Sequence, residues 1–134
     1  MTQPQIAILP AGNYKIGDLC YNNDDWREIL EHPDAFNNTC TGKLKDGREF
    51  WFSGTAYGDG TYSDQHGNQY YVDSGTIGCI RVGDSYFMDK PAGRTFKMEQ
   101  RFECYYENGK ICINGLIIDT DPAYHDEGEE EDYD

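Results

Sequence analysis

Aspartates beside glycine or serine are the residues of this 134-residue chain that could most directly do chemistry. Asp18, Asp59, Asp73 and Asp84 each have such a neighbour. Two carboxylates on either side of a glycosidic bond can serve as acid and base, so a small carboxylate-based enzyme is one hypothesis. The pattern is not specific, because the chain has 25 acidic residues and because aspartate beside glycine also builds turns. The sequence therefore favours a non-catalytic protein.

The cysteines and histidines lack the spacing of a nucleophile–base pair or of a zinc site, which takes closely spaced ligands. The five cysteines are Cys20, Cys40, Cys79, Cys104 and Cys112. The acidic stretch 59–64, followed by Asp73, has oxygen ligands that suit calcium, but it lacks the alternating ligands and closing glutamate of an EF-hand loop. Turn formation explains this stretch better, and we predict no metal and no cofactor.

Tyrosine is heavily used, with 11 copies, and many of them lie in or beside predicted strands. Tyrosine is a common interface anchor, although it is also simply a good strand residue. The residues that we predict to form a binding surface are Asp18, Tyr57, Asp59, Tyr62, Asp64, Tyr70, Asp73 and Asp84. An alternative is a protein that binds or sequesters a nucleotide, with aromatic rings stacked on the base and phosphate held by Arg81, Arg94 and Arg101.

The net charge of −14 is unevenly distributed along the chain. Residues 119–134 hold nine carboxylates and no basic side chain, which predicts a flexible acidic tail. This acidity argues against nucleic acid or anionic lipid as a direct partner and favours a host protein with a basic surface. Residues 1–10 lack the basic region of a signal peptide, and no apolar run could span a membrane. With an odd number of cysteines, these features predict a cytoplasmic location.

The remaining pattern is that of short strands joined by tight turns. Lys-Asp-Gly-Arg at 45–48, Gly-Asn at 67–68, Gly-Asp at 83–84 and Asn-Gly at 108–109 predict turns between strands. The last hairpin joins a strand over 95–106 to one over 110–118, with Cys104 opposite Ile113. The second of these strands is apolar on both faces and is expected at the centre of its sheet. Phe50-Trp51-Phe52 predicts a strand covered on both faces.

A single short helix is predicted over residues 24–32, capped by Asp24 or Asp25 and ended by Pro33. Trp26 and Ile29 lie on one face of this helix, which should dock on the strands. We therefore predict a mainly β protein, an antiparallel meander that forms a sandwich or small barrel. Residues 1–118 would form one domain and residues 119–134 the tail.

Two stretches resemble a group of small, uncharacterised acidic proteins of bacteria and their phages. They are YKIGDLCY at 14–21, followed by Trp26, and DGTY at 59–62 with YVDSGTI at 71–77. The resemblance implies no established activity. Phage proteins that block host defence are often small and acidic, so the leading hypothesis is a phage-type inhibitor. It would bind a host nucleic-acid-handling protein through an acidic, tyrosine-bearing surface.

Overall fold

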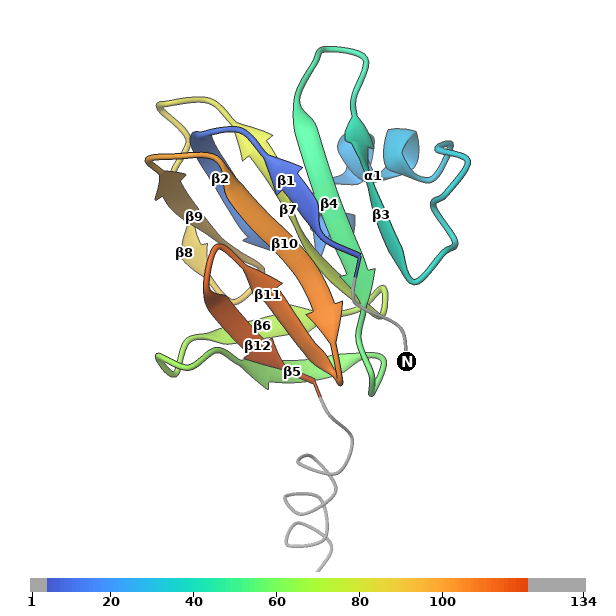
Figure 1. Cartoon of the computed structure of the whole chain (residues 1–134), viewed down its shortest axis with the longest axis vertical. Helices are drawn as coiled ribbons and strands as arrows, with labels where there is room; N and C mark the ends of the chain where they lie inside the picture. The colour runs from blue at the N-terminus through green and yellow to red at the C-terminus, as the bar shows by residue number, and fades with distance from the viewer. Residues whose placement is uncertain (1–4, 121–134) are drawn as a thin grey trace, which may run out of the picture.

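The structure, a computed structural model, describes residues 5–120 and is mainly β, with two antiparallel sheets packed face to face (Figure 1). The larger sheet has the strand order β3 (Thr39–Lys43), β4 (Glu49–Gly54), β7 (Thr76–Val82), β2 (Gly12–Gly17), β9 (Gly93–Met98) and β8 (Asp89–Lys90). The smaller sheet has the order β1 (Ala7–Leu9), β10 (Phe102–Glu107), β11 (Lys110–Ile113) and β12 (Leu116–Asp119). A ribbon of β5 (Gly60–Ser63) and β6 (Gln69–Val72) lies across one end of the sandwich (Figure 1).

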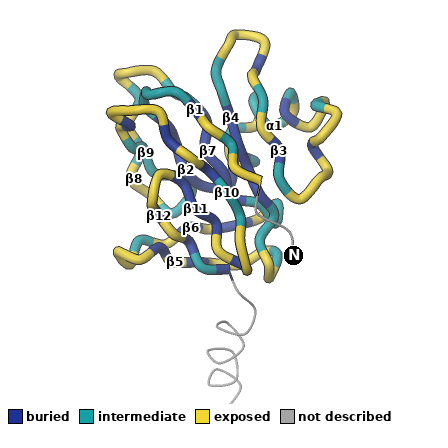
Figure 2. The backbone as a smooth tube through the Cα atoms, in the orientation of Figure 1, coloured by how far each residue is buried: buried dark blue, intermediate teal, exposed yellow. Residues whose placement is uncertain are grey.

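Two apolar cores hold the larger sheet in place. One lies between the sheets and includes Trp51 of β4 and Ile111 of β11. The other lies on the outer face of the larger sheet, where Phe50 and Phe52 pack beneath the short helices. Phe50, Trp51 and Phe52 are therefore all buried, which confirms the prediction of a strand covered on both faces. Figure 2 shows the same pattern, with buried strand centres and exposed turns.

The helical segment differs from the prediction at both ends. A 3-10 turn, η1 (Leu19–Tyr21), precedes α1 (Asn23–Ile29), and Asn22 occupies the N-cap position instead of Asp24 or Asp25. The helix ends at Ile29, before the predicted end at residue 32 and before Pro33. Both aspartates lie in the first turn of α1, where their charges suit the helix dipole. Trp26 docks on the sheet as predicted, with its ring centroid 5.5 Å from that of Phe52.

Two predicted long strands are each divided by a turn. Residues 99–101 separate β9 from β10 and carry the chain from the larger sheet to the smaller one. Both strands direct their apolar side chains into the same core, so the alternation continues through the break. Asn114 and Gly115, both at positive φ, likewise separate β11 from β12. β11 lies inside the sheet, between β10 and β12, whereas β12 is an edge strand. The prediction of a central position is therefore confirmed for residues 110–113 and wrong for residues 116–118.

The predicted register of the last hairpin is confirmed, with Cys104 opposite Ile113 and Tyr105 opposite Cys112. The hairpin between β3 and β4 is also present, although its loop spans residues 44–48. Residues 85–88 form no strand, and β8 follows them instead.

At the end of the described chain, β12 includes Asp119, and Thr120 is buried, two residues beyond the boundary predicted at 118. The backbone N–H of Thr120 donates to the carbonyl of Gly109 over 2.7 Å, which fastens this segment to the β10–β11 turn. The rest of the predicted acidic tail lies outside the described residues. Among residues 5–120, no helix is long and apolar enough to cross a membrane.

Candidate protein-binding face

Asp18 is a buried structural residue that fastens the turn at residues 73–75 to the larger sheet. Its carboxylate accepts hydrogen bonds from the backbone N–H groups of Cys20 (2.9 Å), Asp73 (2.6 Å) and Ser74 (2.7 Å) and from the Ser74 hydroxyl (2.7 Å). These bonds join the Gly-Asp stretch at 17–18 to the Asp-Ser-Gly stretch at 73–75. The carboxylate is enclosed by donors from the protein, so it has no room for a substrate.

Asp64 has a comparable role in the β5–β6 turn. It accepts hydrogen bonds from the Tyr70 hydroxyl (2.8 Å) and from the backbone N–H groups of His66 (2.8 Å) and Asn68 (3.0 Å). Burial acts to raise the pKa of Asp64, but these donors together outweigh it and lower the pKa. Within residues 5–120, no group of three or more acidic, histidine or cysteine side chains is arranged to hold a metal ion. The hydrogen bonds of Asp64 organise the turn from residue 64 to residue 70.

The other predicted site residues are spread over different surroundings. Tyr62 is buried, and its hydroxyl donates to the carbonyl of Gly58 over 2.7 Å, whereas Tyr57 and Asp59 are exposed. Asp73 is exposed and accepts a hydrogen bond of 2.6 Å from the Tyr21 hydroxyl, which raises the pKa of that tyrosine. Tyr70 is buried beneath Arg94, whose guanidinium carbon lies 5.6 Å from the centre of the ring.

The four aspartates of the enzyme hypothesis do not meet in one place. Asp59 lies by the turn at 73–75, with Oδ1 3.7 Å from where a Cβ on Gly75 would stand. Asp84 instead accepts a 3.0 Å hydrogen bond from Asn13, at the opposite end of β2 from Asp18. The eight predicted residues therefore form no single surface.

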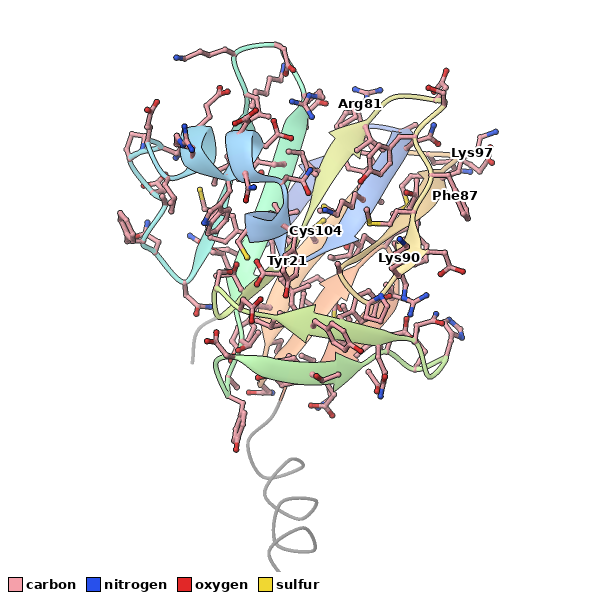
Figure 3. All side chains as sticks on the ribbon, turned by 180° about the vertical axis from the view of Figure 1, so that it is seen from behind. Tyr21, Arg81, Phe87, Lys90, Lys97 and Cys104 are labelled. Carbon is pink, nitrogen blue, oxygen red and sulfur yellow. The ribbon has the colours of Figure 1, made fainter. Side chains whose placement is uncertain are left out.

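Two of the three arginines predicted to hold a phosphate, Arg81 and Arg94, are engaged with protein acceptors, whereas Arg101 is exposed. Arg81 pairs with Glu49 over 3.0 Å and donates to the carbonyl of Ala11 over 2.8 Å. Arg94 pairs with Asp89. Figure 3 shows Arg81 well separated from Tyr21 along the larger sheet. No arginine cluster forms around a shared aromatic platform within the described residues.

The outer face of the smaller sheet holds a surface that the sequence reasoning missed. Strand register places Tyr105, Cys112 and Ile117 in one row across β10, β11 and β12, on the side away from the core. Ile8 of the neighbouring β1 and Ile6, just before that strand, are 58% and 53% exposed, while Ala7 and Leu9 turn inward. These five residues form what we call the apolar row, in which Cys112 is only 6% exposed between its register partners Tyr105 and Ile117. No described helix covers it, whereas α1 covers part of the other sheet (Figure 1).

Carboxylates lie on both sides of the apolar row. Glu103 is paired in register with Ile8, and Glu107 is paired with Lys110, which in turn lies opposite Asp119. Lys110 is the single basic side chain among these residues, and its Nζ lies 4.0 Å from an oxygen of Asp119. Neither Glu103 nor Glu107 forms an ion pair with another described residue. The face is therefore apolar at its centre and negative at its borders.

A groove of about 540 Å³ lies next to Ile6, at the edge of the smaller sheet. It lies between β1 and β3, and Ile6, Asp34 and Thr41 are among the residues that line it. Asp34 adds another carboxylate beside the apolar row.

Strand alternation in the sequence was the signal that could have revealed this face. Alternation along β10 puts Glu103, Tyr105 and Glu107 on one side of the strand, and Ile6 and Ile8 precede the first sequence motif. Which of these side chains share a face depends on the pairing of β1 with β10, almost 100 residues apart in the sequence. No family model, no curated protein sequence and no solved structure matches this chain.

Proposed function

We propose that this protein is a non-catalytic inhibitor that docks the outer face of its smaller sheet onto a basic protein surface and blocks it. The observation that carries the proposal is the exposure of Ile6, Ile8 and Ile117 in the apolar row, with Glu103 on one side and Glu107 on the other. Exposed contiguous apolar surface rimmed by polar residues is typical of protein interfaces. Phage-type inhibition of a host protein that handles nucleic acid is the biological role we infer for it.

The apolar row would provide most of the binding energy. Full burial of an isoleucine side chain is worth roughly 2 kcal/mol, so Ile6 and Ile8, each about half exposed, would add about 1 kcal/mol apiece. Tyr105 is partly buried against Cys112, which leaves a rigid aromatic edge in the middle of the row. Rigid aromatic and branched side chains are frequent anchors because they lose little conformational freedom on binding.

The carboxylates would select the partner and speed its approach. Acidic side chains beside the row attract a basic surface and repel an acidic one. Proteins that handle nucleic acid present basic grooves, which makes them the partner class that suits this face. The described acidic residues also occupy the far side of the molecule, on and beside α1, so docking through one face does not require the whole chain to imitate a nucleic acid.

A matched pair of charge-reversal variants tests this proposal. The partner is first captured from a bacterial lysate at about 50 mM salt, identified, purified and titrated against the full chain. Glu103→Lys/Glu107→Lys reverses the borders of the apolar row. Asp24→Lys/Glu31→Lys makes the same change in net charge on the α1 side.

The first variant should weaken binding at least about tenfold and the second less than about threefold. Ile8→Ser removes apolar contact area, so it should weaken binding by a factor that does not change with salt concentration. Equal loss from both charge variants would show that net charge, and not this face, drives association. Binding of equal strength at about 50 and 500 mM salt would exclude the electrostatic part of the proposal.

A further inference from the structure

Two of the five cysteines face each other across the interface between the sheets. Cys79 lies in β7 of the larger sheet and Cys104 in β10 of the smaller one, and their Sγ atoms are 3.8 Å apart. Both side chains are fully buried, and Cys104 lies in the middle of the molecule (Figure 3). All five cysteines are free thiols, and no other pair of sulfurs is in contact within residues 5–120.

We propose that Cys79 and Cys104 are a disulfide site that links the two sheets when the chain folds in the presence of a small disulfide oxidant. The thiolate of one cysteine attacks a sulfur of glutathione disulfide, forms a mixed disulfide and releases one glutathione thiolate. The thiolate of the second cysteine then attacks the protein sulfur of that mixed disulfide and releases the other glutathione. Two protein thiols are oxidised, one glutathione disulfide is reduced, and the two protons pass to the released thiolates.

The surrounding strands hold the two sulfurs in position. β7 is paired with β4 and β2, and β10 is paired with β1 and β11, so neither strand is an edge. Within these ladders, Cys79 lies between Trp51 and Ile16, and Cys104 lies between Ala7 and Ile113. A disulfide needs the sulfurs to approach to about 2.05 Å, which is a movement of two unbranched side chains within a fixed frame.

The positions of the other cysteines make the pairing selective. Cys112 lies on the outer face of its sheet, so it points away from Cys104. Cys40 packs in the second core, where its Sγ is 3.7 Å from Nδ1 of His32. Cys20 lies within η1 and is partly exposed. One linked pair and three free thiols is therefore the expected oxidised form.

Burial controls when the bond can form. Exchange needs a thiolate, and burial raises the pKa of the Cys79 thiol well above its usual value. Reaction in the folded state is consequently slow, so the bond forms while the sheets assemble. Once formed, it is shielded from reductants by the same burial. In a reducing compartment the two residues stay as thiols that fill the core.

Oxidative refolding of the full chain tests the site. The unfolded protein is refolded either with reduced and oxidised glutathione or with dithiothreitol, and free thiols are then alkylated and mapped by mass spectrometry. With glutathione we expect a peptide linking positions 79 and 104 and alkylation at the other three cysteines. Because the bond closes a loop of 25 residues, the melting temperature should rise by on the order of 10 °C over the reduced protein.

Two variants provide the control for this shift. Cys104→Ser should abolish the gain, whereas Cys20→Ser, at a partly exposed thiol, should retain it. The redox comparison on the wild-type chain decides the matter even if Cys104→Ser fails to fold. The proposal is overturned if all five cysteines are alkylated after oxidative refolding. It is equally overturned if other pairs are linked, or if the 79–104 link brings no rise in melting temperature.

Discussion

Removing the Asp18 side chain should cost a large part of the stability of this fold. The carboxylate is fully buried and accepts four hydrogen bonds, three of them from backbone N–H groups. A buried donor left without an acceptor costs about 1–3 kcal/mol. Asp18→Ala leaves three such donors, and partial entry of water beside the half-buried Ser74 offsets some of the loss. The expected decrease in the free energy of unfolding is therefore about 3–5 kcal/mol, against a total of roughly 5–15 kcal/mol.

The isosteric substitution Asp18→Asn separates the hydrogen bonds from the space that the side chain fills. The amide oxygen can take the place of Oδ2 and still accept from the N–H groups of Asp73 and Ser74. The amide nitrogen then faces the N–H of Cys20, which cannot donate to it. The Ser74 hydroxyl can rotate and accept a hydrogen bond from the amide nitrogen. The N–H of Cys20 is left without an acceptor, and the negative charge is removed. We therefore expect the free energy of unfolding to decrease by about 2–3 kcal/mol, intermediate between wild type and Asp18→Ala.

Urea unfolding followed by tryptophan fluorescence measures both effects as a fall in the midpoint at an unchanged slope. Asp84→Ala is the control, because Asp84 is exposed and its one hydrogen bond, from Asn13, is at the surface. It should change stability by less than about 0.5 kcal/mol. If Asp18→Ala were no more destabilising than Asp84→Ala, the Asp18 carboxylate would not be what joins the 73–75 turn to the larger sheet.

Three further predictions concern other buried groups. Burial raises the pKa of Tyr14 and Tyr70, helped by Glu49 at Tyr14 and by a hydrogen bond to Asp64 at Tyr70. Both should stay protonated near pH 11, while the stability of the fold falls above about pH 10, where tyrosines of the unfolded chain ionise. Phenolate absorbance from these two residues below about pH 11 would contradict this. The pKa of Asp64 is lowered on folding, so its contribution to stability is present above about pH 4 and is lost as the pH falls further. Asp64→Asn should therefore flatten the acid side of a stability–pH curve, and an unchanged curve would contradict this. A chain ended after Thr120 should melt at the temperature of the full chain. A chain ended after Ile118 loses the hydrogen bonds of Thr120 to Gly109 and should be less stable by about 2 kcal/mol. Equal melting temperatures for the two truncated chains would show that these bonds contribute nothing.

Local chemistry determined which parts of the fold the sequence could predict. Asn108-Gly109 forces a tight turn, and the alternation on either side then leaves one register in which the apolar faces coincide, so the pairing of Cys104 with Ile113 could be derived. The break between β9 and β10 could not be derived in this way, because strands of both sheets direct apolar side chains into one shared core. Alternation specifies which side of a strand is buried and does not specify the sheet to which the strand belongs.

The same reasoning explains why the site residues were harder to predict than the strands. The carboxylates of Asp18 and Asp73 both occur in turn sequences, and nothing local shows that one is buried and the other exposed. The distinction depends on a contact across 55 positions, where the Asp18 carboxylate accepts the backbone N–H of Asp73. The apolar row depends in the same way on the distant pairing of β1 with β10. Contacts of this kind are products of the tertiary fold.

The exposed Ile8 of β1 and Ile6 just before it affect how the protein behaves alone. An apolar edge strand promotes association with a second copy of the same chain. Here, Glu103 is paired with Ile8, Glu107 lies further along the same strand, and the described part of the chain has 17 acidic and 11 basic side chains. Two copies brought together through this face would oppose carboxylate to carboxylate, which disfavours the pairing, whereas a basic partner would be attracted. The same carboxylates thus weaken self-association and favour a basic partner, which is how specificity arises as a difference between two affinities.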